Sequence, residues 1–346
     1  MAQWASMVLD HYRYTGDLKV VSDLYPNLVR VMGYLGGFMD GDGLLKAVHG
    51  FPFLDWMPGI MGSPEENRAE LTGMNCHYYR ALHDAAELAG FVGEKTQQND
   101  WMGKAEKLKR AINEWLWSEE QGAYAHSRSG DKLASQLAVH DSILAAYAGV
   151  APPERVSRSL TNLFEKPRQD VIQIGTPYFY FFYLRALRGA GRHQEALDVT
   201  RRAYGKMLAA GATTWWEQFG GYASLCHAWS TAPTSDLSRN VLGVQPTEPG
   251  YAAFRVEPYP ADLTWARGVI PTVHGDVSIA WKREGSSFEL TVTAPMKAVV
   301  ELSVPAKSLE TTRLTSKAKP QKQAFADGRA RYWVEGPGTF RVLAEG

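Results

Sequence analysis

The residues best suited to chemistry lie in one short segment that contains a carboxylate. Glu217 directly follows two tryptophans in the run Gly211-Ala212-Thr213-Thr214-Trp215-Trp216-Glu217-Gln218-Phe219, between the end of one predicted helix and the start of the next. Apolar rings beside a carboxylate remove part of its water, which makes it a better proton acceptor near neutral pH. The segment therefore indicates a general base. A Glu that caps the following helix, beside two core tryptophans, explains it equally well.

Two further segments place polar groups beside aromatic ones. Phe53-Leu54-Asp55-Trp56 lies in a long irregular stretch, 40–64, where an acid could bind sugar hydroxyls and an indole could stack on a sugar ring. His227 follows Glu217 by ten residues and could return to the same rim of a helical fold. The structural alternatives are a helix-capping Asp beside a buried Trp, and a histidine that is hydrogen-bonded in the core.

The sequence predicts neither a metal site nor a cofactor. It contains no His-Glu-x-x-His run, no Cys-x-x-Cys run, and no phosphate-binding glycine motif. Asp40-Gly41-Asp42-Gly43 resembles the start of a calcium loop, but the twelfth position holds Phe51 instead of a glutamate, which favours a plain turn. Cys76 and Cys226 are expected to be small buried apolar residues.

Composition limits the classes of partner. The 346 residues include 37 basic and 37 acidic ones, and this balance gives no electrostatic reason to expect nucleic acid or an anionic membrane. An uncharged or small substrate is therefore expected. Aromatic residues make up 12%, which suits a sugar site and suits a Trp-rich helical core equally well. The first residues show no signal peptide, and this favours a cytoplasmic location.

The chain changes character at a Pro/Gly-rich break, 244–250. Residues 1–245 show helical spacing, with about nine helices joined as antiparallel pairs, and residues 250–346 alternate as strands do. The sequence thus predicts a ring of helical hairpins followed by an antiparallel β-sandwich of about 95 residues. The helices are expected at 18–38, 67–89, 100–117, around 133–147, from 152, at 178–188, 193–208 and 222–242, the last interrupted at Pro233.

Taken in order, these segments resemble the bacterial α-L-rhamnosidases of glycoside hydrolase family 78, in the six-hairpin glycosidase superfamily. The resemblance covers nearly the whole chain. It rests on Tyr14-Thr15-Gly16-Asp17, Leu54-Asp55-Trp56, Gly175-Thr176-Pro177-Tyr178, Gly211 to Glu217, His227 to Thr234, Gly243-Val244-Gln245-Pro246 and Pro249-Gly250-Tyr251.

The resemblance implies inverting exo-hydrolysis of terminal α-L-rhamnose by an (α/α)6 barrel. Glu217 falls on the family's general base, and Trp56 and His227 fall on positions that line the sugar site. Asp55, Tyr178 and Trp216 are expected to bind substrate beside them. The two carboxylates of an inverting pair stand roughly 6.5–9.5 Å apart, so that water fits between them.

One departure from the family pattern limits what the chain is expected to do. The family's general acid is a Glu in an upstream motif rich in Asp, Arg and Trp-Gly-Asp, and no such motif occurs here. Six hairpins need twelve helices, so the chain is expected to begin inside the barrel and to leave apolar helix faces through which it associates. Two alternatives stay open, namely a six-hairpin glycosidase for another sugar and a non-catalytic carbohydrate-binding subunit.

Overall fold

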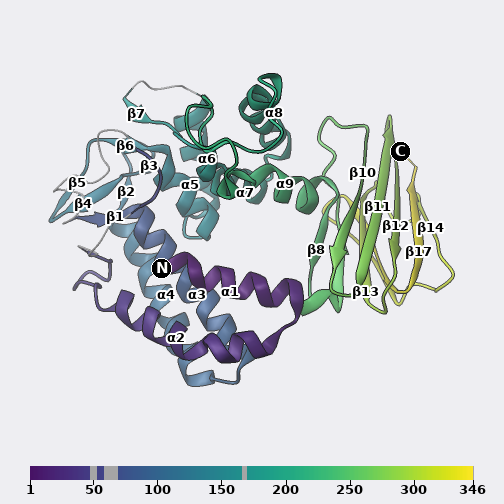
Figure 1. Cartoon of the computed structure of the whole chain (residues 1–346), viewed down its shortest axis with the longest axis horizontal. Coiled ribbons are helices and arrows are strands. Elements are labelled where there is room, and N and C mark those ends of the chain that lie inside the picture. Colours follow the sequence, from purple (N-terminus) through teal and green to yellow (C-terminus); the bar gives the residue numbers. More distant parts are fainter. Residues whose placement is uncertain (47–52, 58–68, 166–169, 346) are drawn as a thin grey trace. The chain divides into compact units, whose positions relative to one another are not determined.

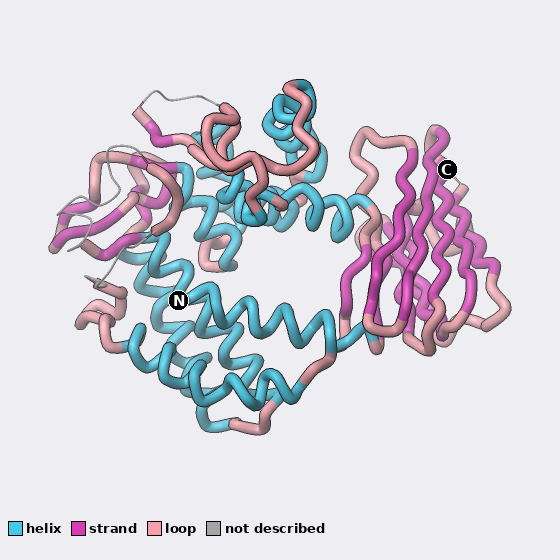
Figure 2. Tube along the Cα trace, in the orientation of Figure 1, coloured by secondary structure: helices cyan, strands magenta, loops and turns pink. Residues whose placement is uncertain are grey.

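The computed structural model describes residues 1–46, 53–57, 69–165 and 170–345. Helices dominate the first part of this chain and strands the second, as Figures 1 and 2 show. The chain divides into two compact units, residues 1–9 with 18–232 and residues 10–17 with 233–346. The predicted fold class, a helical hairpin region followed by a β-sandwich, is confirmed.

The α-helices of the described residues follow the predicted segments closely. Gly93, which has a φ of +84°, lies in the turn after the third helix, where a left-handed residue is needed to reverse the chain. Short 3₁₀ or π turns precede or follow several helices, namely η2 (Thr161–Glu165), η3 (Pro177–Phe179), η4 (Ala228–Ser230) and η5 (Leu237–Val241), while η6 (Pro249–Tyr251) lies between the strands 244–246 and 253–256. The helices are α1 (Ala2–Thr15), α2 (Leu18–Gly36), α3 (Thr72–Phe91), α4 (Lys95–Trp115), α5 (Val139–Ala148), α6 (Pro153–Leu160), α7 (Tyr180–Gly189), α8 (His193–Ala209) and α9 (Ala232–Asp236).

Consecutive helices of the first unit pack as hairpins placed side by side. α3 packs against α4, α5 against α6, and α7 against α8, while α5 also contacts both α3 and α7. Most of α3 is buried, because neighbouring helices cover it on several sides. A row of inner helices, each with its partner outside it, is the arrangement of an α/α toroid.

Two predicted helical segments are partly wrong. Leu133 and Leu137 belong to short strands, and the helix begins only at Val139. Tyr222 to His227 form a loop before η4 instead of the first turns of a helix. Both errors arise in short apolar runs, where spacing alone does not separate helix from strand or loop. The small strands are β1 (Glu70–Leu71), β2 (Trp117–Ser118), β3 (Ala123–Tyr124), β4 (Ser127–Ser129), β5 (Lys132–Leu133), β6 (Leu137–Ala138) and β7 (Val171–Ile172).

The second unit contains two five-stranded sheets, in the orders β10-β11-β12-β17-β14 and β15-β16-β13-β9-β8. Neighbouring strands are antiparallel except β9 and β13, which pair in parallel and so depart from the predicted purely antiparallel sandwich. The strands are β8 (Val244–Pro246), β9 (Ala253–Val256), β10 (Trp265–Thr272), β11 (Gly275–Glu284), β12 (Ser287–Ala294), β13 (Val299–Pro305), β14 (Thr312–Thr315), β15 (Lys322–Ala326), β16 (Arg329–Glu335) and β17 (Gly338–Ala344).

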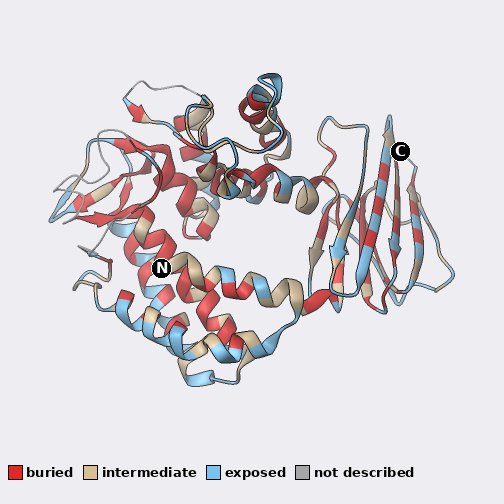
Figure 3. Ribbon diagram, in the orientation of Figure 1, coloured by how far each residue is buried: buried red, intermediate tan, exposed pale blue. Residues whose placement is uncertain are grey.

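Burial alternates along β11 and β12, as the alternating colours in Figure 3 show. In β11, Val277, Ile279 and Trp281 are buried, while Ser278 and Ala280 between them are exposed. Successive side chains of a strand point to opposite faces, so this pattern builds a core between the sheets.

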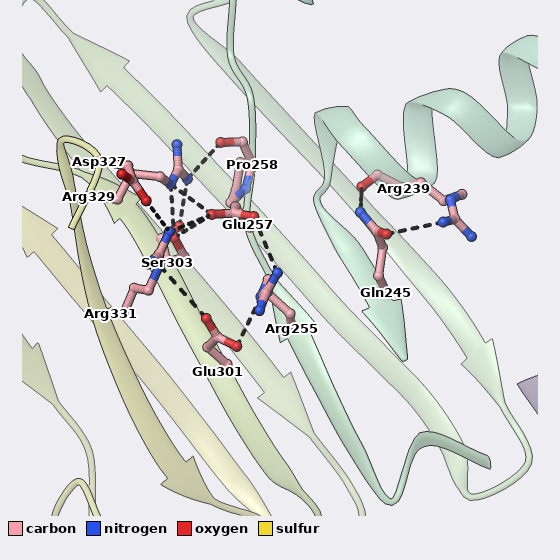
Figure 4. Close-up of polar contacts among 10 residues, drawn as sticks. All are labelled: Arg239, Gln245, Arg255, Glu257, Pro258, Glu301, Ser303, Asp327, Arg329 and Arg331. Atoms are coloured by element: carbon pink, nitrogen blue, oxygen red, sulfur yellow. Dashed lines mark hydrogen bonds and ion pairs between the residues drawn. The ribbon is translucent and has the colours of Figure 1, made fainter. Parts of the chain in front are cut away.

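A network of charged side chains crosses one sheet of the sandwich (Figure 4). Arg329 donates to the hydroxyl and the carbonyl of Ser303 and lies 3.2 Å from Glu257. Burial lowers the pKa of Arg329, while the nearby Glu257 carboxylate acts in the opposite direction. Because each buried charge has partners, the network fixes β13 and β16 against the segment that follows β9.

Residues 10–17, the end of α1 and the turn after it, belong to the second unit. Tyr14 packs edge-on against Tyr251, with ring centroids 6.0 Å apart, and its hydroxyl accepts a hydrogen bond from Arg239. A Cβ at Gly16 would lie 3.3 Å from the Cα of Gly250, so the two backbones meet closely.

Candidate active site

The segment after α8 forms a loop that folds back on itself. The Glu217 amide donates to the carbonyl of Ser224 (2.8 Å), and the His227 amide donates to the carbonyl of Trp215 (2.9 Å). The hydroxyl of Thr214 also bonds the carbonyl of Leu225. These hydrogen bonds hold residues 214–217 beside residues 224–227 of the same loop.

The folded loop brings Glu217 and His227 together. His227 Nδ1 lies 3.9 Å from Glu217 Oε2, and the Ser224 amide donates to the same oxygen over 3.3 Å. The side chains of Glu217 and His227 are 21% and 29% exposed, so the carboxylate is partly shielded yet reachable by solvent. A positioned carboxylate of this kind can accept a proton from a water molecule.

Four aromatic side chains, Phe53, Trp56, Tyr178 and Trp229, form a cluster beside His227, which we call the aromatic platform. Phe53 lies at its centre, with ring centroids 5.5 Å from Trp56, 5.7 Å from Tyr178 and 6.2 Å from Trp229. The His227 ring is 4.3 Å from that of Trp229. Trp56 is 42% exposed, so part of an indole on the aromatic platform is accessible to solvent.

Asp55 is directed at protein donors and has no exposed surface. Its carboxylate accepts from the Trp56 amide (2.8 Å) and the Thr176 hydroxyl (2.5 Å), and lies 3.0 Å from His140 Nε2. The Gly175 amide makes a fourth, longer contact at 3.4 Å. Asp55 therefore holds the Trp56 segment against the residues before η3, and it presents no free oxygen for a sugar hydroxyl.

Tyr178 belongs to η3, and a hydrogen bond from α1 to its hydroxyl holds it in the aromatic platform. Gln3 of α1 donates to its hydroxyl over 2.8 Å, and the same amide nitrogen lies 3.5 Å from His77 Nε2. Burial raises the pKa of Tyr178, although the hydrogen bond from Gln3 acts in the opposite direction. Burial lowers the pKa of His77 to about 4, so this imidazole is neutral at physiological pH.

The two tryptophans before Glu217 pack inward. Trp215 lies edge-on to Tyr204, with centroids 5.1 Å apart, and Trp216 packs on the same buried cluster of α8. Trp216 also lies against Gly221, where a Cβ would come within 2.9 Å of the indole. Both rings are half-buried, which fits the structural interpretation of these residues and leaves an edge of Trp216 exposed.

Some predicted features are corrected or lie outside the described part of the chain. Cys76 is buried as expected, but Cys226 is exposed, because the segment that carries it is a loop. Asp40 to Gly43 forms a turn in which Asp40 accepts backbone hydrogen bonds from Asp42 and Leu44. Phe51 and most of the stretch 40–64 lie outside the described residues.

Trp229, His140 and Gln3 were not predicted as site residues. Trp229 had a weak signal, since it follows His227 by two positions. His140 and Gln3 had none, because their contacts join segments 85 and 175 residues apart. Among the described residues, no cluster of His, Cys, Asp and Glu is suited to a metal ion. None of the helices in that part of the chain is both long and apolar enough to span a bilayer.

Comparisons with known proteins match both regions of the chain. A family model described as the bacterial α-L-rhamnosidase six-hairpin glycosidase domain matches residues 1–241. A second model, the bacterial α-L-rhamnosidase C-terminal domain, matches residues 243–319. The helical region and the β-sandwich thus correspond to a six-hairpin glycosidase domain and its C-terminal domain. The chain belongs to the bacterial α-L-rhamnosidase family.

Individual relatives agree with this membership. An α-L-rhamnosidase of Alteromonas sp. (strain LOR) is 29% identical over 90% of this chain, which spans 35% of that protein. A family 78 rhamnosidase structure from Bacillus sp. GL1 aligns over 82% of this chain and 31% of its own, with a TM-score of 0.75 and 31% identity. An α-L-rhamnosidase structure from Dictyoglumus thermophilum aligns over the whole chain and 39% of its own, with a TM-score of 0.79 and 21% identity. The chain spans about a third of the length of the curated relatives it matches.

Proposed function

We propose that this chain supplies the general base and part of the sugar pocket of an inverting exo-α-L-rhamnosidase. The observation that supports this most is the pairing of Glu217 with His227 beside the aromatic platform. Family membership makes a rhamnoside the first substrate to test, and related structures are described with L-rhamnose bound.

In the proposed reaction, the Glu217 carboxylate takes a proton from a water molecule as its oxygen attacks the anomeric carbon of rhamnose. The bond from that carbon to the glycosidic oxygen breaks, and a general acid protonates the departing oxygen. The family's acid motif does not occur in the sequence, so we place that acid upstream of these residues. The Ser224 amide and His227 would hold the carboxylate in position during the proton transfer.

We assign substrate contact to four residues and positioning to one. Trp56 would offer an exposed indole to the apolar face of the ring, and Tyr178, Trp216 and His227 would supply further contacts. Asp55 acts through Trp56, because its carboxylate holds the Trp56 amide and has no free face. This role replaces the predicted direct contact with sugar hydroxyls.

The test is Glu217→Gln in the protein extended upstream to the length of its relatives. Loss of the base is expected to lower kcat on p-nitrophenyl α-L-rhamnoside roughly 10²–10⁴-fold, while rhamnose still binds in calorimetry. Gln218→Glu, combined with Glu217→Gln, is the control for position, because it moves the carboxylate by one residue and is not expected to restore turnover. Unchanged kcat in Glu217→Gln would remove Glu217 from this role.

A non-catalytic carbohydrate-binding function is the second candidate. It is favoured by one observation, namely that the family's general-acid motif does not occur in these 346 residues. Under this alternative, Glu217→Gln would leave rhamnose binding intact and the extended wild-type protein would show no turnover. A panel of nitrophenyl glycosides would separate both candidates from a six-hairpin glycosidase for another sugar.

A further inference from the structure

A cavity of about 320 Å³ is lined by residues of α7 and α8, and one of them, Tyr180, also contacts Phe219 of the Glu217 loop. The two helices pack against each other, as Figure 1 shows. Tyr183, Val199 and Ala203 are buried and form its floor, while Gln173, Arg202 and Lys206 are exposed at its rim. An apolar floor with a few polar groups at the mouth is typical of small-molecule sites, and the volume is at the lower end of their range, about 300–1,000 Å³.

The rim of the cavity carries two positive side chains, Arg202 and Lys206. They lie one turn apart on α8, and none of the described residues that line the cavity is a carboxylate. The charge of Glu195 acts on Tyr183, but Glu195 forms an ion pair with Arg192. In the part of the chain that the structure describes, neither cation forms an ion pair, whereas the adjacent Arg201, which does not line the cavity, lies 3.3 Å from Asp198. Two positively charged side chains at the opening of the cavity favour an anionic ligand.

Aromatic rings supply the walls. Tyr183 stacks on Phe164, with centroids 4.6 Å apart and planes 16° from parallel. Burial raises the pKa of both Tyr180 and Tyr183, and the charge of Arg202 acts in the opposite direction on both. Both phenols therefore keep their protons near neutral pH and can donate hydrogen bonds, and the Arg202 charge is close enough to affect both hydroxyls.

Tyr180 connects the cavity to the candidate active site. Its ring lies 5.2 Å from that of Phe219, which follows Glu217 by two residues, and 5.7 Å from that of Tyr204. Tyr180 is thus a wall common to the cavity and to the cluster that supports the Glu217 loop. A ligand in the cavity would occupy a site separate from Glu217 yet adjacent to its loop.

We propose that this cavity is a second carbohydrate site, which binds a pyranose ring that carries a carboxylate. Arg202 would bind the carboxylate through paired N–H donors, with Lys206 as a second positive charge. The tyrosine rings would face the apolar side of the sugar, and Gln173 would bond a hydroxyl. A bare inorganic anion would contact the cations but leave the aromatic walls uncovered. The inference does not depend on the role of Glu217.

The test measures binding of D-glucuronate, D-glucose and inorganic phosphate to the protein by calorimetry and by NMR chemical shifts. Glucuronate is expected to bind at least roughly tenfold more tightly than either of the others, and less tightly as salt rises from about 0.05 to 0.5 M. The double variant Arg202→Gln/Lys206→Gln should weaken glucuronate binding by roughly tenfold or more, because glutamine preserves the helix but removes the charge.

Arg201→Gln is the matched control and should bind glucuronate as the unaltered protein does. Glu217→Gln should also bind glucuronate unchanged, which separates this site from the proposed catalytic one. Glucose binding as tight as glucuronate, phosphate binding as tight as glucuronate, or equal weakening by Arg201→Gln would each overturn the proposal.

Discussion

The carboxylate of Asp55 lies 3.0 Å from the imidazole of His140, and both side chains are fully buried although 85 residues separate them. Asp55 also holds the Trp56 amide and the Thr176 hydroxyl. The contact therefore joins α5, the Trp56 segment and the residues before η3 at one point. His140, which lies outside the aromatic platform, therefore helps to fix the position of the exposed Trp56 indole through Asp55.

Replacing His140 with Ala should destabilise the protein by about 2–3 kcal/mol, because it leaves a buried carboxylate with fewer partners. Rhamnose binding should weaken as well, since the Trp56 segment loses an anchor. Chemical denaturation and calorimetry measure the two effects. His274→Ala, at an exposed turn of the sandwich, is the control and should change neither. Normal stability in His140→Ala would show that the pair is not an anchor.

Replacing Trp56 with Ala should weaken rhamnose binding roughly tenfold, because an aromatic face against a sugar ring contributes about 1 kcal/mol or more. Trp56→Phe should retain most of the affinity, since it keeps a flat apolar face. Trp265→Ala is the matched control, because that indole is exposed on β10 of the second unit. Equal binding by Trp56→Ala and the unaltered protein would exclude stacking on this ring.

Replacing Gly221 with Ala should destabilise the Glu217 loop by more than the cost of placing an alanine at a positive φ. Gly221 has a φ of +68°, and an added Cβ would lie 2.9 Å from the Trp216 indole. Gly130 has a similar φ of +59° but open space around it, so Gly130→Ala measures the conformational cost alone, about 1–2 kcal/mol. Thermal unfolding of the two variants should differ, and kcat of the extended protein should fall only in Gly221→Ala. If the two variants lost equal thermal stability and kcat, the Trp216 indole would have moved away from the added Cβ without cost.

The buried His77 should make the protein less stable in mild acid. Its pKa in the folded protein is about 4, below the usual 6.5, so the unfolded chain takes up a proton first as pH falls. The stability is fully present above about pH 6.5, is lost as pH falls toward 4, and amounts to roughly 3 kcal/mol at most. Denaturant titrations at several pH values of the unaltered protein and of His77→Gln measure this. The variant should show a shallower decline between pH 6.5 and 4, and parallel curves would contradict the assignment.

The 346 residues alone should hydrolyse p-nitrophenyl α-L-rhamnoside roughly 10²–10⁴-fold more slowly than the protein extended upstream, because general acid assistance is missing. With a leaving group that departs without protonation, such as dinitrophenolate, the difference in rate between the two proteins should be smaller, because general acid assistance then matters less. A kcat of about 1 s⁻¹ or more for the 346 residues with an ordinary leaving group would contradict it, since that is a typical enzyme rate.

Local patterns predicted most of the fold, because its elements are long and regular. Alternation of Val277, Ile279 and Trp281 specified a half-buried strand, and the helix at 193–208 appears as His193–Ala209. The sequence was insufficient where a segment was too short for its period to be read, as at Leu133 and Leu137. It also did not predict the parallel pairing of β9 with β13, which joins strands distant in the chain.

The candidate site was predictable only where its residues are close in sequence. Glu217 and His227 lie on one folded loop, so their proximity followed from a short interval. The support behind Trp56 and Tyr178 comes from His140 and Gln3, which no motif marks and which reach the site through long-range packing. The burial of Asp55 could not be predicted either, because residue type and spacing do not reveal which way a carboxylate faces.

The membership of residues 10–17 in the second unit affects how the protein can be dissected. A recombinant sandwich cut at residue 233, where the second unit resumes, would lack Tyr14, so Tyr251 would lose an edge-on aromatic partner and Arg239 the hydroxyl it bonds. If such an isolated sandwich were unstable or aggregated, the cause would be the missing residues 10–17 and not an inability of the strands to fold. Supplying residues 10–17 as a linked or added peptide is the rational remedy.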